Sequence, residues 1–367
     1  MIKTRARSPL TCEFHDADGA SDVSSDTLAS ITFGEHSDAP GLRNGVPHLP
    51  LRMVDDPGSA FSESWITDGP INSGEVDGLV YAHDHHRLFC AGRIAPSGNY
   101  TNETRAKYST AFELIDSLGF PHLFRMWNYI GDINGDNAEG LETYRDFCRG
   151  RSEAFTTFNK AIPAATGVGA RASGISFYFL STGDATTTHI ENPRQVPAYR
   201  YPARYGPKSP TFARATHVAS SSETDDFGTL FVAGTASILG HETVHAGNLD
   251  RQCDVALANV AYLVGEHNLS KYCPGLSYRL PDMEMIKVYV RHREHLSHIR
   301  NRCEAVFGSD TDIRYLNVDI CRKDLLVEIE GIFHHRRSAD AETPASSGSS
   351  QLPPTGRNAA IDAEDDK

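Results

Sequence analysis

The second half of this 367-residue chain alternates strand patterns with helix patterns, and this order restricts the folds open to it. Residues 248–264 and 293–307 place apolar side chains at helical spacing, and residues 285–291 alternate as a strand does. The predicted elements are a strand at 229–238, a helix at 248–264, a strand at 285–291, a helix at 293–307, and strands at 313–320 and 325–333. The order β-α-β-α-β-β predicts an α+β or α/β layer, in which helices pack on one face of a sheet.

The first half of the chain shows a looser version of the same order. The predicted elements are a hairpin at 79–94 with its turn at HDHH, a helix at 103–118 that ends at Gly119, a strand at 123–130, a helix at 139–160 and a strand at 173–182. The agreement between the halves indicates an internal structural duplication. The loop-rich stretch from Thr182 to Thr229 is long for a simple connection, so we expect it to be functional.

The two ends of the chain have a different composition. Residues 1–27 are rich in serine and aspartate and lack periodicity, which predicts a flexible N-terminus. Residues 337–367 are small, polar and proline-containing, which predicts a disordered tail. The folded part is then predicted to consist of two domains, at 28–170 and 171–336.

Charge and composition exclude several classes of protein. The net charge of −13 disfavours non-specific binding to nucleic acid. No apolar run reaches the roughly 18 residues of a membrane helix, and the basic start of the chain is not followed by the apolar stretch of a secretory signal. We therefore expect a cytoplasmic protein without a membrane or nucleic-acid partner. The seven cysteines are odd in number and form no CxxC, which favours free thiols over disulfides.

Residues 241–245 (HETVH) match the HExxH pattern of zinc proteases, in which both histidines lie on one helix face and the glutamate is the general base. The flanking Gly240 and Gly247 place the motif in a strand-to-helix connection rather than inside a helix. A zinc site also needs a third ligand, for which Glu266 is the only tempting downstream carboxylate. A zinc hydrolase and a structured turn both remain open, and we favour the turn, with no metal.

A basic, tyrosine-rich stretch lies between Asn192 and Arg214 in this acidic protein. Arginine forks bind carboxylates in a bidentate manner, and tyrosine hydroxyls add directional hydrogen bonds, so the stretch is compatible with a dicarboxylate pocket. A solvated loop held by prolines explains the same residues. The residues concerned are Arg194, Tyr199, Arg200, Tyr201, Arg204, Tyr205, Lys208 and Arg214.

Glu328 and Glu330 lie two positions apart in a predicted strand and therefore share one face of it. If that face lines a cleft, the two charges oppose joint ionisation and one carboxyl becomes a general acid. If the strand is half exposed, both simply face water. Cys321 precedes Arg322, a neighbour that would lower the pKa of the thiol; a buried, inert cysteine is the alternative.

Six segments together resemble the chorismatase family, which includes the 3-hydroxybenzoate synthases. They are RMWNY (125–129) with Ile133 and Asn134, YRDFCRGRSEAF (144–155), NPRQVPAY (192–199), YGPKSPTFARA (205–215), GTASILGHETVHAGN (234–248) with Gln252, and ICRKDLLVEIEG (320–331). They follow the family order from about residue 120 to 335. The resemblance implies an α+β fold of two RidA/YjgF-like units in one chain, related to AroH-type chorismate mutase, with the active site beside the second unit. It also implies that HETVH needs no metal.

The resemblance further implies roles for individual residues. Arg151 and Arg214, together with Tyr205, match the clamp for the substrate carboxylates. Glu330 matches the proton donor, and Glu328 is the second choice for that role.

Gly240 is placed with the substrate-binding residues. It and the residues near Cys321 lie where family members with different products differ.

The implied reaction cleaves the enolpyruvyl ether of chorismate and releases pyruvate without a cofactor. The second product is either a dihydroxycyclohexadiene carboxylate or 3-hydroxybenzoate, and the sequence leaves this choice open. The implied partner is the small-molecule substrate alone, and a monomer is expected. Two alternatives remain: the zinc hydrolase, and a RidA-like binding protein without catalysis.

Overall fold

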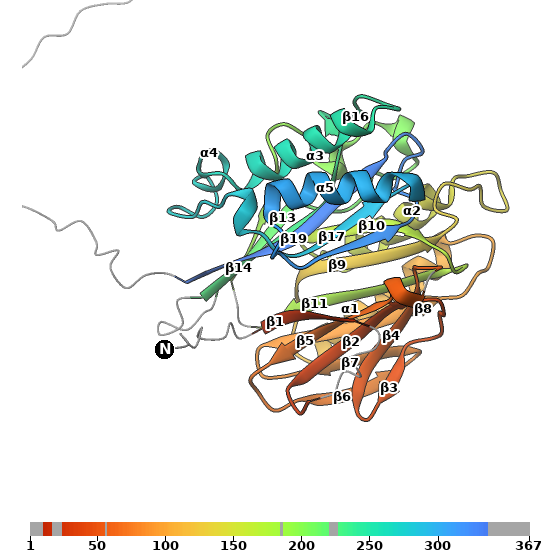
Figure 1. The fold of residues 1–367 in the computed structure, drawn as a ribbon. Coiled ribbons are helices and arrows are strands. Elements are labelled where there is room, and N and C mark those ends of the chain that lie inside the picture. Colours follow the sequence, from red (N-terminus) through yellow and green to blue (C-terminus); the bar gives the residue numbers. More distant parts are fainter. Residues whose placement is uncertain (1–9, 17–23, 56, 184–185, 220–226, 337–367) are drawn as a thin grey trace, which may run out of the picture. The chain divides into compact units, whose positions relative to one another are not determined.

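The part of the chain that the computed structural model describes comprises residues 10–16, 24–55, 57–183, 186–219 and 227–336 (Figure 1). These residues belong to one compact unit that ends at Arg336. The tail predicted at 337–367 lies outside the described residues. Among the helices described, none is long and apolar enough to cross a membrane.

The chain begins with a five-stranded sheet that the sequence patterns did not predict, here called the N-terminal sheet. Its strands, in the spatial order β1-β5-β2-β4-β3, are β1 (Leu10–Asp16), β2 (Thr27–Gly34), β3 (Gly41–Arg43), β4 (Val46–Arg52) and β5 (Phe61–Thr67). The prediction of a flexible 1–27 is wrong for β1, because Leu10, Cys12 and Phe14 are buried and the strand pairs with β5 along its whole length.

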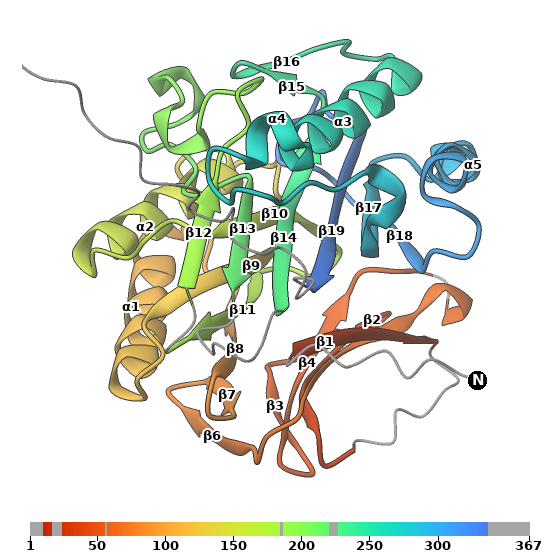
Figure 2. The same cartoon turned by 90° about the vertical axis from the view of Figure 1, so that its left-hand side faces the viewer.

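A six-stranded sheet with two helices follows, here called the first repeat. Its elements are β6 (Asn72–Val76), β7 (Leu79–His83), β8 (Arg87–Ile94), α1 (Thr101–Ser117), β9 (His122–Gly131), α2 (Thr143–Thr157), β10 (Ala164–Ala170) and β11 (Ile175–Thr182). The predicted hairpin, both helices and two strands are confirmed with shifted ends. The helices α1 and α2 lie side by side (Figure 2), and the Asp146 carboxylate of α2 accepts the Tyr100 and Thr101 N–H groups at the start of α1.

The second repeat is again a six-stranded sheet with two long helices. Its main elements are β12 (Thr186–Ile190), β13 (Ala215–Ala219), β14 (Phe227–Ala236), α3 (Leu249–Val264), β17 (Glu284–Val290), α5 (Leu296–Phe307), β18 (Ile313–Asn317) and β19 (Val327–Arg336). The short elements β15 (Ile238–Leu239), β16 (Glu242–Thr243) and α4 (Glu266–Leu269) lie in its connections. All six elements predicted in this half are confirmed. Figure 1 shows α3 and α5 together over one face of the sheet.

The two repeats have the same topology. Read from one edge, the first sheet has the order β6-β7-β8-β11-β9-β10 and the second has β12-β13-β14-β19-β17-β18. In each, the helices occupy equivalent places in the chain order, and the last two strands of the list pair in parallel. The predicted α+β class and the duplication are therefore confirmed. The predicted boundary between domains at residue 170 stays a prediction, although β11, which follows it, pairs with β8 and β9 of the first repeat.

The core is divided by the faces of the sheets. In each repeat one face packs under the helices, and strand alternation sends Phe177 of β11 and Ile329 of β19 to those two separate cores. The opposite faces of both repeats meet the N-terminal sheet in a shared core that contains Trp65, Tyr178 and Ile332. The strand β10 also bridges to the second repeat at Ala164↔Ala213 and Val168↔Ile320, which holds the two repeats together beside the cavity described next.

Candidate active site

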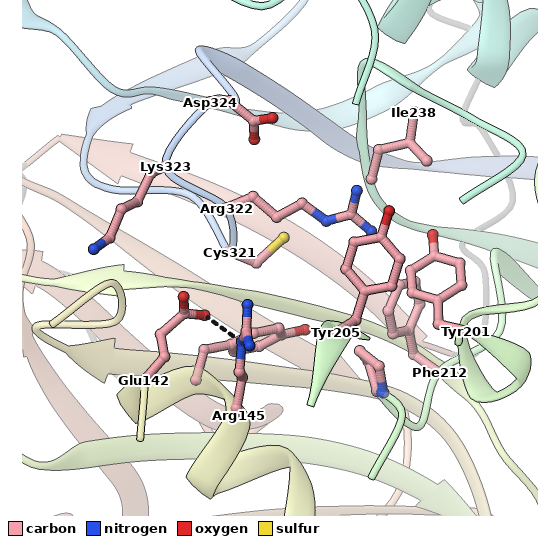
Figure 3. Close-up of a pocket in the computed structure, with 12 residues that line it drawn as sticks. Glu142, Arg145, Tyr201, Tyr205, Phe212, Ile238, Cys321, Arg322, Lys323 and Asp324 are labelled. Atoms are coloured by element: carbon pink, nitrogen blue, oxygen red, sulfur yellow. Dashed lines mark ion pairs between the residues drawn. The ribbon is translucent and has the colours of Figure 1, made fainter. Parts of the chain in front are cut away.

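A cavity of about 290 Å³ lies where the two repeats meet (Figure 3). Its wall comes from the start of α2, the loop between β12 and β13, strand β15 and the loop before β19. The lining residues are Glu142, Tyr144, Arg145, Tyr201, Tyr205, Pro210, Phe212, Ile238, Cys321, Arg322, Lys323 and Asp324. The stretch predicted as loop-rich at 182–229 contains the strands β12 and β13, and the connection between them contributes to the cavity wall.

The loop positions its tyrosines through two proline-led turns. Pro197 and Pro202 precede short 3-10 helices, and the residues at the end of these turns are Tyr201 and Tyr205, which line the cavity. The Arg322 guanidinium lies 4.2 Å from the Tyr205 ring centroid and 5.3 Å from that of Tyr201. Its Nη1 donates to the His241 carbonyl at 2.9 Å, so the cation is fixed in the wall.

The cavity lining contains more cationic than acidic side chains. Arg145, Arg322 and Lys323 are cationic, whereas Glu142 and Asp324 are acidic, and Arg145 Nε lies 3.7 Å from the Glu142 carboxylate (Figure 3). In a protein with a net charge of −13, a cavity with an excess of cations favours an anionic guest.

Arg151 and Arg214 do not line the cavity but lie behind its wall, with 3% and 2% of their surface exposed. Arg151 Nη1 donates to the Thr211 carbonyl, and the Arg214 guanidinium lies 4.9 Å from the Phe212 ring centroid while donating to the Tyr201 hydroxyl at 2.8 Å. Within the described residues neither arginine forms a salt bridge, and the Nε of each is buried without a hydrogen-bond partner. The carboxyl of Glu191 near Arg214 is itself buried, and burial raises its pKa to about 7. Two buried guanidinium groups outside any salt bridge are typical of an anion site, because a buried charge that is not fully paired is costly.

Glu328 is buried in β19, with 4% of its surface exposed. Burial, reinforced by the nearby negative charge of Glu330, raises its pKa to about 8. It lies near Tyr144 and Cys321, which line the cavity and whose pKa values its ionised form raises. Its carboxyl packs against Gly234, where a Cβ would overlap Oε1. Glu328 is therefore a protonated carboxyl at neutral pH next to the cavity.

Glu330 is also buried, but unlike Glu328 it is surrounded by hydrogen-bond donors and cations. Its carboxylate accepts hydrogen bonds from Arg125 Nη2 and Trp127 Nε1, both at 2.8 Å, and from the Thr166 hydroxyl, and it lies 3.2 Å from Lys287 Nζ. Burial acts to raise its pKa, but the Lys287 and Arg125 charges and these hydrogen bonds outweigh burial, so the pKa is lowered. The expectation of a neutral Glu330 is wrong, because its partners come from strands distant in sequence.

Known proteins resemble this chain over most of its length. The family model described as "Chorismatase FkbO/Hyg5-like, N-terminal" matches residues 63–181. A 3-hydroxybenzoate synthase of Streptomyces hygroscopicus is 49% identical over 84% of this chain and 92% of its own, and a chorismatase of Streptomyces rapamycinicus is 41% identical over 88% and 97%. The chain belongs to the chorismatase family.

A solved structure supports the assignment at the level of the fold. A crystal structure of a chorismatase matches this chain with a TM-score of 0.84 at 39% identity, covering 88% of this chain and 98% of that one. The protein is thus an enzyme of this family, and its fold matches that of a solved relative over 88% of the chain.

The HETVH segment of this chorismatase does not form the helix that a zinc hydrolase requires. Ile238 pairs with Thr243 and Leu239 with Glu242, so the motif lies across a tight hairpin turn at Gly240, whose φ is +58°. Glu242 forms an exposed ion pair with Arg204 at 2.8 Å. Among the described residues, no group of three or more His, Cys, Asp or Glu side chains is placed to hold a metal.

The structure also locates the two positions that the resemblance connected with product choice. Gly240 does not line the cavity; its carbonyl accepts the Val196 N–H, and a Cβ there meets open space. Cys321 does line the cavity, but burial and the nearby Glu328 raise the pKa of its thiol. Of the two interpretations of Cys321, the inert cysteine is the one that agrees with this raised pKa, because desolvation outweighs the charge of Arg322.

Several site residues were missed from the sequence. Arg145 and Tyr144 belong to a segment that carried the resemblance, but only the position of α2 shows that its first turn faces the cavity. Arg322 was visible as a cation beside Cys321, a signal that pointed to the right loop. Gly234 carried no local signal, since its closeness to Glu328 arises from the pairing of β14 with β19.

Proposed function

We propose that this enzyme cleaves the enolpyruvyl ether of chorismate and that Glu328 delivers the proton. The observation that carries the proposal is a buried carboxyl that keeps its proton at neutral pH beside a cavity with cationic walls. A general acid is most effective when its pKa lies near the working pH. Glu330 lacks this property because it is held ionised.

The reaction balances without any further reagent. Glu328 protonates the methylene carbon of the enol ether, which produces an oxocarbenium ion at the ether carbon. Water adds to this carbon and returns a proton to the carboxylate, and the resulting hemiketal breaks into pyruvate and a dihydroxycyclohexadiene carboxylate. In the second branch a ring hydroxyl takes the place of water, and loss of the pyruvate unit with aromatisation leaves 3-hydroxybenzoate. We expect 3-hydroxybenzoate, since the relative at 49% identity carries that name.

We assign the two substrate carboxylates to Arg151 and Arg214, with Tyr205 as an additional donor. The buried, unpaired Nε atoms of both arginines and their contacts with the Thr211–Phe212 wall support this assignment. Fixed guanidinium groups orient a dianion relative to the acid, and orientation supplies a large part of a rate enhancement.

A coupled lactate dehydrogenase assay with chorismate tests the function, with products identified by mass and ultraviolet spectrum. Pyruvate release by the wild type and its loss in Glu328→Gln are expected. Glu103→Gln, an exposed glutamate of α1, is the control for the amide substitution and should retain activity. Binding of chorismate in a calorimeter without turnover would instead identify a binding protein.

We also propose that one chain forms a complete site, so that the enzyme acts as a monomer. Both repeats contribute lining residues to the same cavity from a single chain. Light scattering over a range of protein concentrations, combined with specific activity, tests this: activity that depends on concentration contradicts it. The cytoplasmic location stays a prediction from the sequence.

A further inference from the structure

Four charged side chains form a buried ion-pair cluster that connects all three sheets. Glu63 of the N-terminal sheet lies 2.5 Å from Lys287 Nζ of β17, Lys287 lies 3.2 Å from Glu330 of β19, and Glu330 accepts Arg125 of β9 at 2.8 Å. None of the four is more than 3% exposed. Buried ion pairs contribute little net stability in comparison with apolar packing, so their presence here calls for a role.

Hydrogen bonds connect these four charged side chains to Glu328, the proposed acid. The Thr166 hydroxyl of β10 donates to the Glu330 carboxylate and accepts the Gly234 N–H at 2.9 Å. Gly234 in turn forms the surface against which the Glu328 carboxyl rests, so closely that a Cβ would overlap it. The position of Glu328 therefore depends on a backbone segment that Glu330 fixes through Thr166.

Glu330 also influences Glu328 electrostatically. Glu328 and Glu330 point to the same face of β19, and the negative charge of Glu330 opposes ionisation of its neighbour. Arg125 and Arg214 favour ionisation of Glu328, so Glu330 offsets their effect. The charged and titratable groups that act on Glu328 or feel its charge are Glu330 on its own strand, Arg125 on β9, Arg214 before β13, Tyr144 on α2 and Cys321 in the loop before β19.

We infer that Glu330 is a positioning residue that keeps the proton on Glu328 and holds its carboxyl in place, while Lys287, Arg125 and Thr166 hold Glu330 ionised. The inference rests on the proposed role of Glu328 as the acid. It assigns the N-terminal sheet a part in the chemistry, since Glu63 balances the charge of Lys287.

The first test is the double variant Glu330→Gln/Lys287→Met, which removes one negative and one positive charge and so leaves the net charge of the buried cluster unchanged. Loss of the Glu330 charge should move the alkaline limb of the kcat–pH profile about 1 to 2 pH units toward acid, while KM changes little. An alkaline limb that stays in place in the folded variant overturns the inference.

The second test separates the hydrogen-bond route from the charge. Thr166→Val removes the hydroxyl at nearly constant volume and should lower kcat about tenfold, the effect of one lost hydrogen bond to a charged group, without raising KM. Thr166→Ser restores the hydroxyl and should restore most of the rate. Equal activity of the valine and serine variants contradicts the route through Thr166, and this pair decides the question if the double variant does not fold.

A readout that needs no turnover distinguishes this inference from the proposed function. The infrared band of the protonated Glu328 carboxyl, assigned by its loss in Glu328→Gln, can be titrated in the wild type and in the double variant. A midpoint near pH 8 that falls in the double variant supports the inference. If the wild type releases no pyruvate, the proposed function fails, whereas an unchanged band midpoint defeats the positioning role alone.

Discussion

The two repeats share one topology but use the equivalent strand differently. In the first repeat, β11 sends Tyr178 and Leu180 to the face that points away from the helices, where they pack in the shared core. In the second repeat, β19 sends Glu328 and Glu330 to the corresponding face. The same backbone arrangement therefore places an uncharged tyrosine and a leucine on this face in one repeat, and a pair of buried carboxyls in the other.

The two buried carboxyls of the second repeat depend on contacts with the first. Arg125 and Thr166, which hold Glu330 ionised, belong to β9 and β10 of the first repeat, and Tyr144 and Arg145 of α2 form part of the cavity wall. The first repeat thus supplies the partners of two carboxyls that it does not itself carry. The cavity proposed as the active site lies between the two repeats, and both contribute to its lining.

The largest expected effect comes from removing the acid that distinguishes the repeats. Glu328→Gln should lower kcat about 10²- to 10⁴-fold, the usual contribution of a general acid. Leu180→Met, a volume-conserving change on the same face of β11, should leave kcat nearly unchanged. Steady-state pyruvate release measures both, and a loss of kcat in Leu180→Met as large as that in Glu328→Gln would contradict the division of roles.

A smaller effect is expected from the arginines behind the wall. Arg151→Lys and Arg214→Lys keep the positive charge but lose the bidentate guanidinium group. Each should lower kcat/KM about 10- to 100-fold, because one charge-assisted hydrogen bond to a substrate carboxylate is removed. Arg200→Lys is the matched control on the same loop, because Arg200 is exposed and does not line the cavity. Similar kcat/KM values for all three variants would remove Arg151 and Arg214 from the clamp.

A third effect concerns stability and pH. The folded protein retains the Glu328 proton up to about pH 8, whereas the unfolded chain loses it near 4.5, so this residue makes folding less favourable as pH rises between these values. Glu328→Gln removes the dependence. The melting temperature of the variant relative to the wild type should therefore increase from pH 5 to pH 8 and then level off. A constant difference across this range would show that Glu328 is ionised in the folded protein.

The smallest effect is expected from metal removal. HETVH lies in a hairpin beside the cavity rather than on a helix, so dialysis against a chelator should leave kcat unchanged within error. Metal analysis of the purified protein accompanies the assay. Activity that is lost on chelation and restored by zinc would return the zinc hydrolase to consideration.

Much of the architecture was predictable from local patterns. Helical spacing at 248–264 and alternation at 285–291 depend only on neighbouring residues, and both became the expected elements, α3 and β17. The N-terminal sheet was missed because its strands carry many polar residues, such as Glu63 and Ser64 in β5, whose burial depends on partners elsewhere in the chain.

The site was predictable only in part. Tyr205 and Cys321 line the cavity, whereas the proton-donor role that the resemblance implied for Glu330 is here proposed for Glu328. Glu328 and Glu330 are equivalent in the sequence, two acids on one strand face with apolar neighbours. No local pattern tells which of them is ionised.

The sequence by itself determined the order of strands and helices, the duplication and the family, because these are properties of short segments and their succession. Only the tertiary structure decided which carboxyl keeps its proton. The pKa of a buried acid depends on the charges packed around it, and Arg125 reaches Glu330 from 205 residues away, whereas Glu328 forms no salt bridge within the described residues.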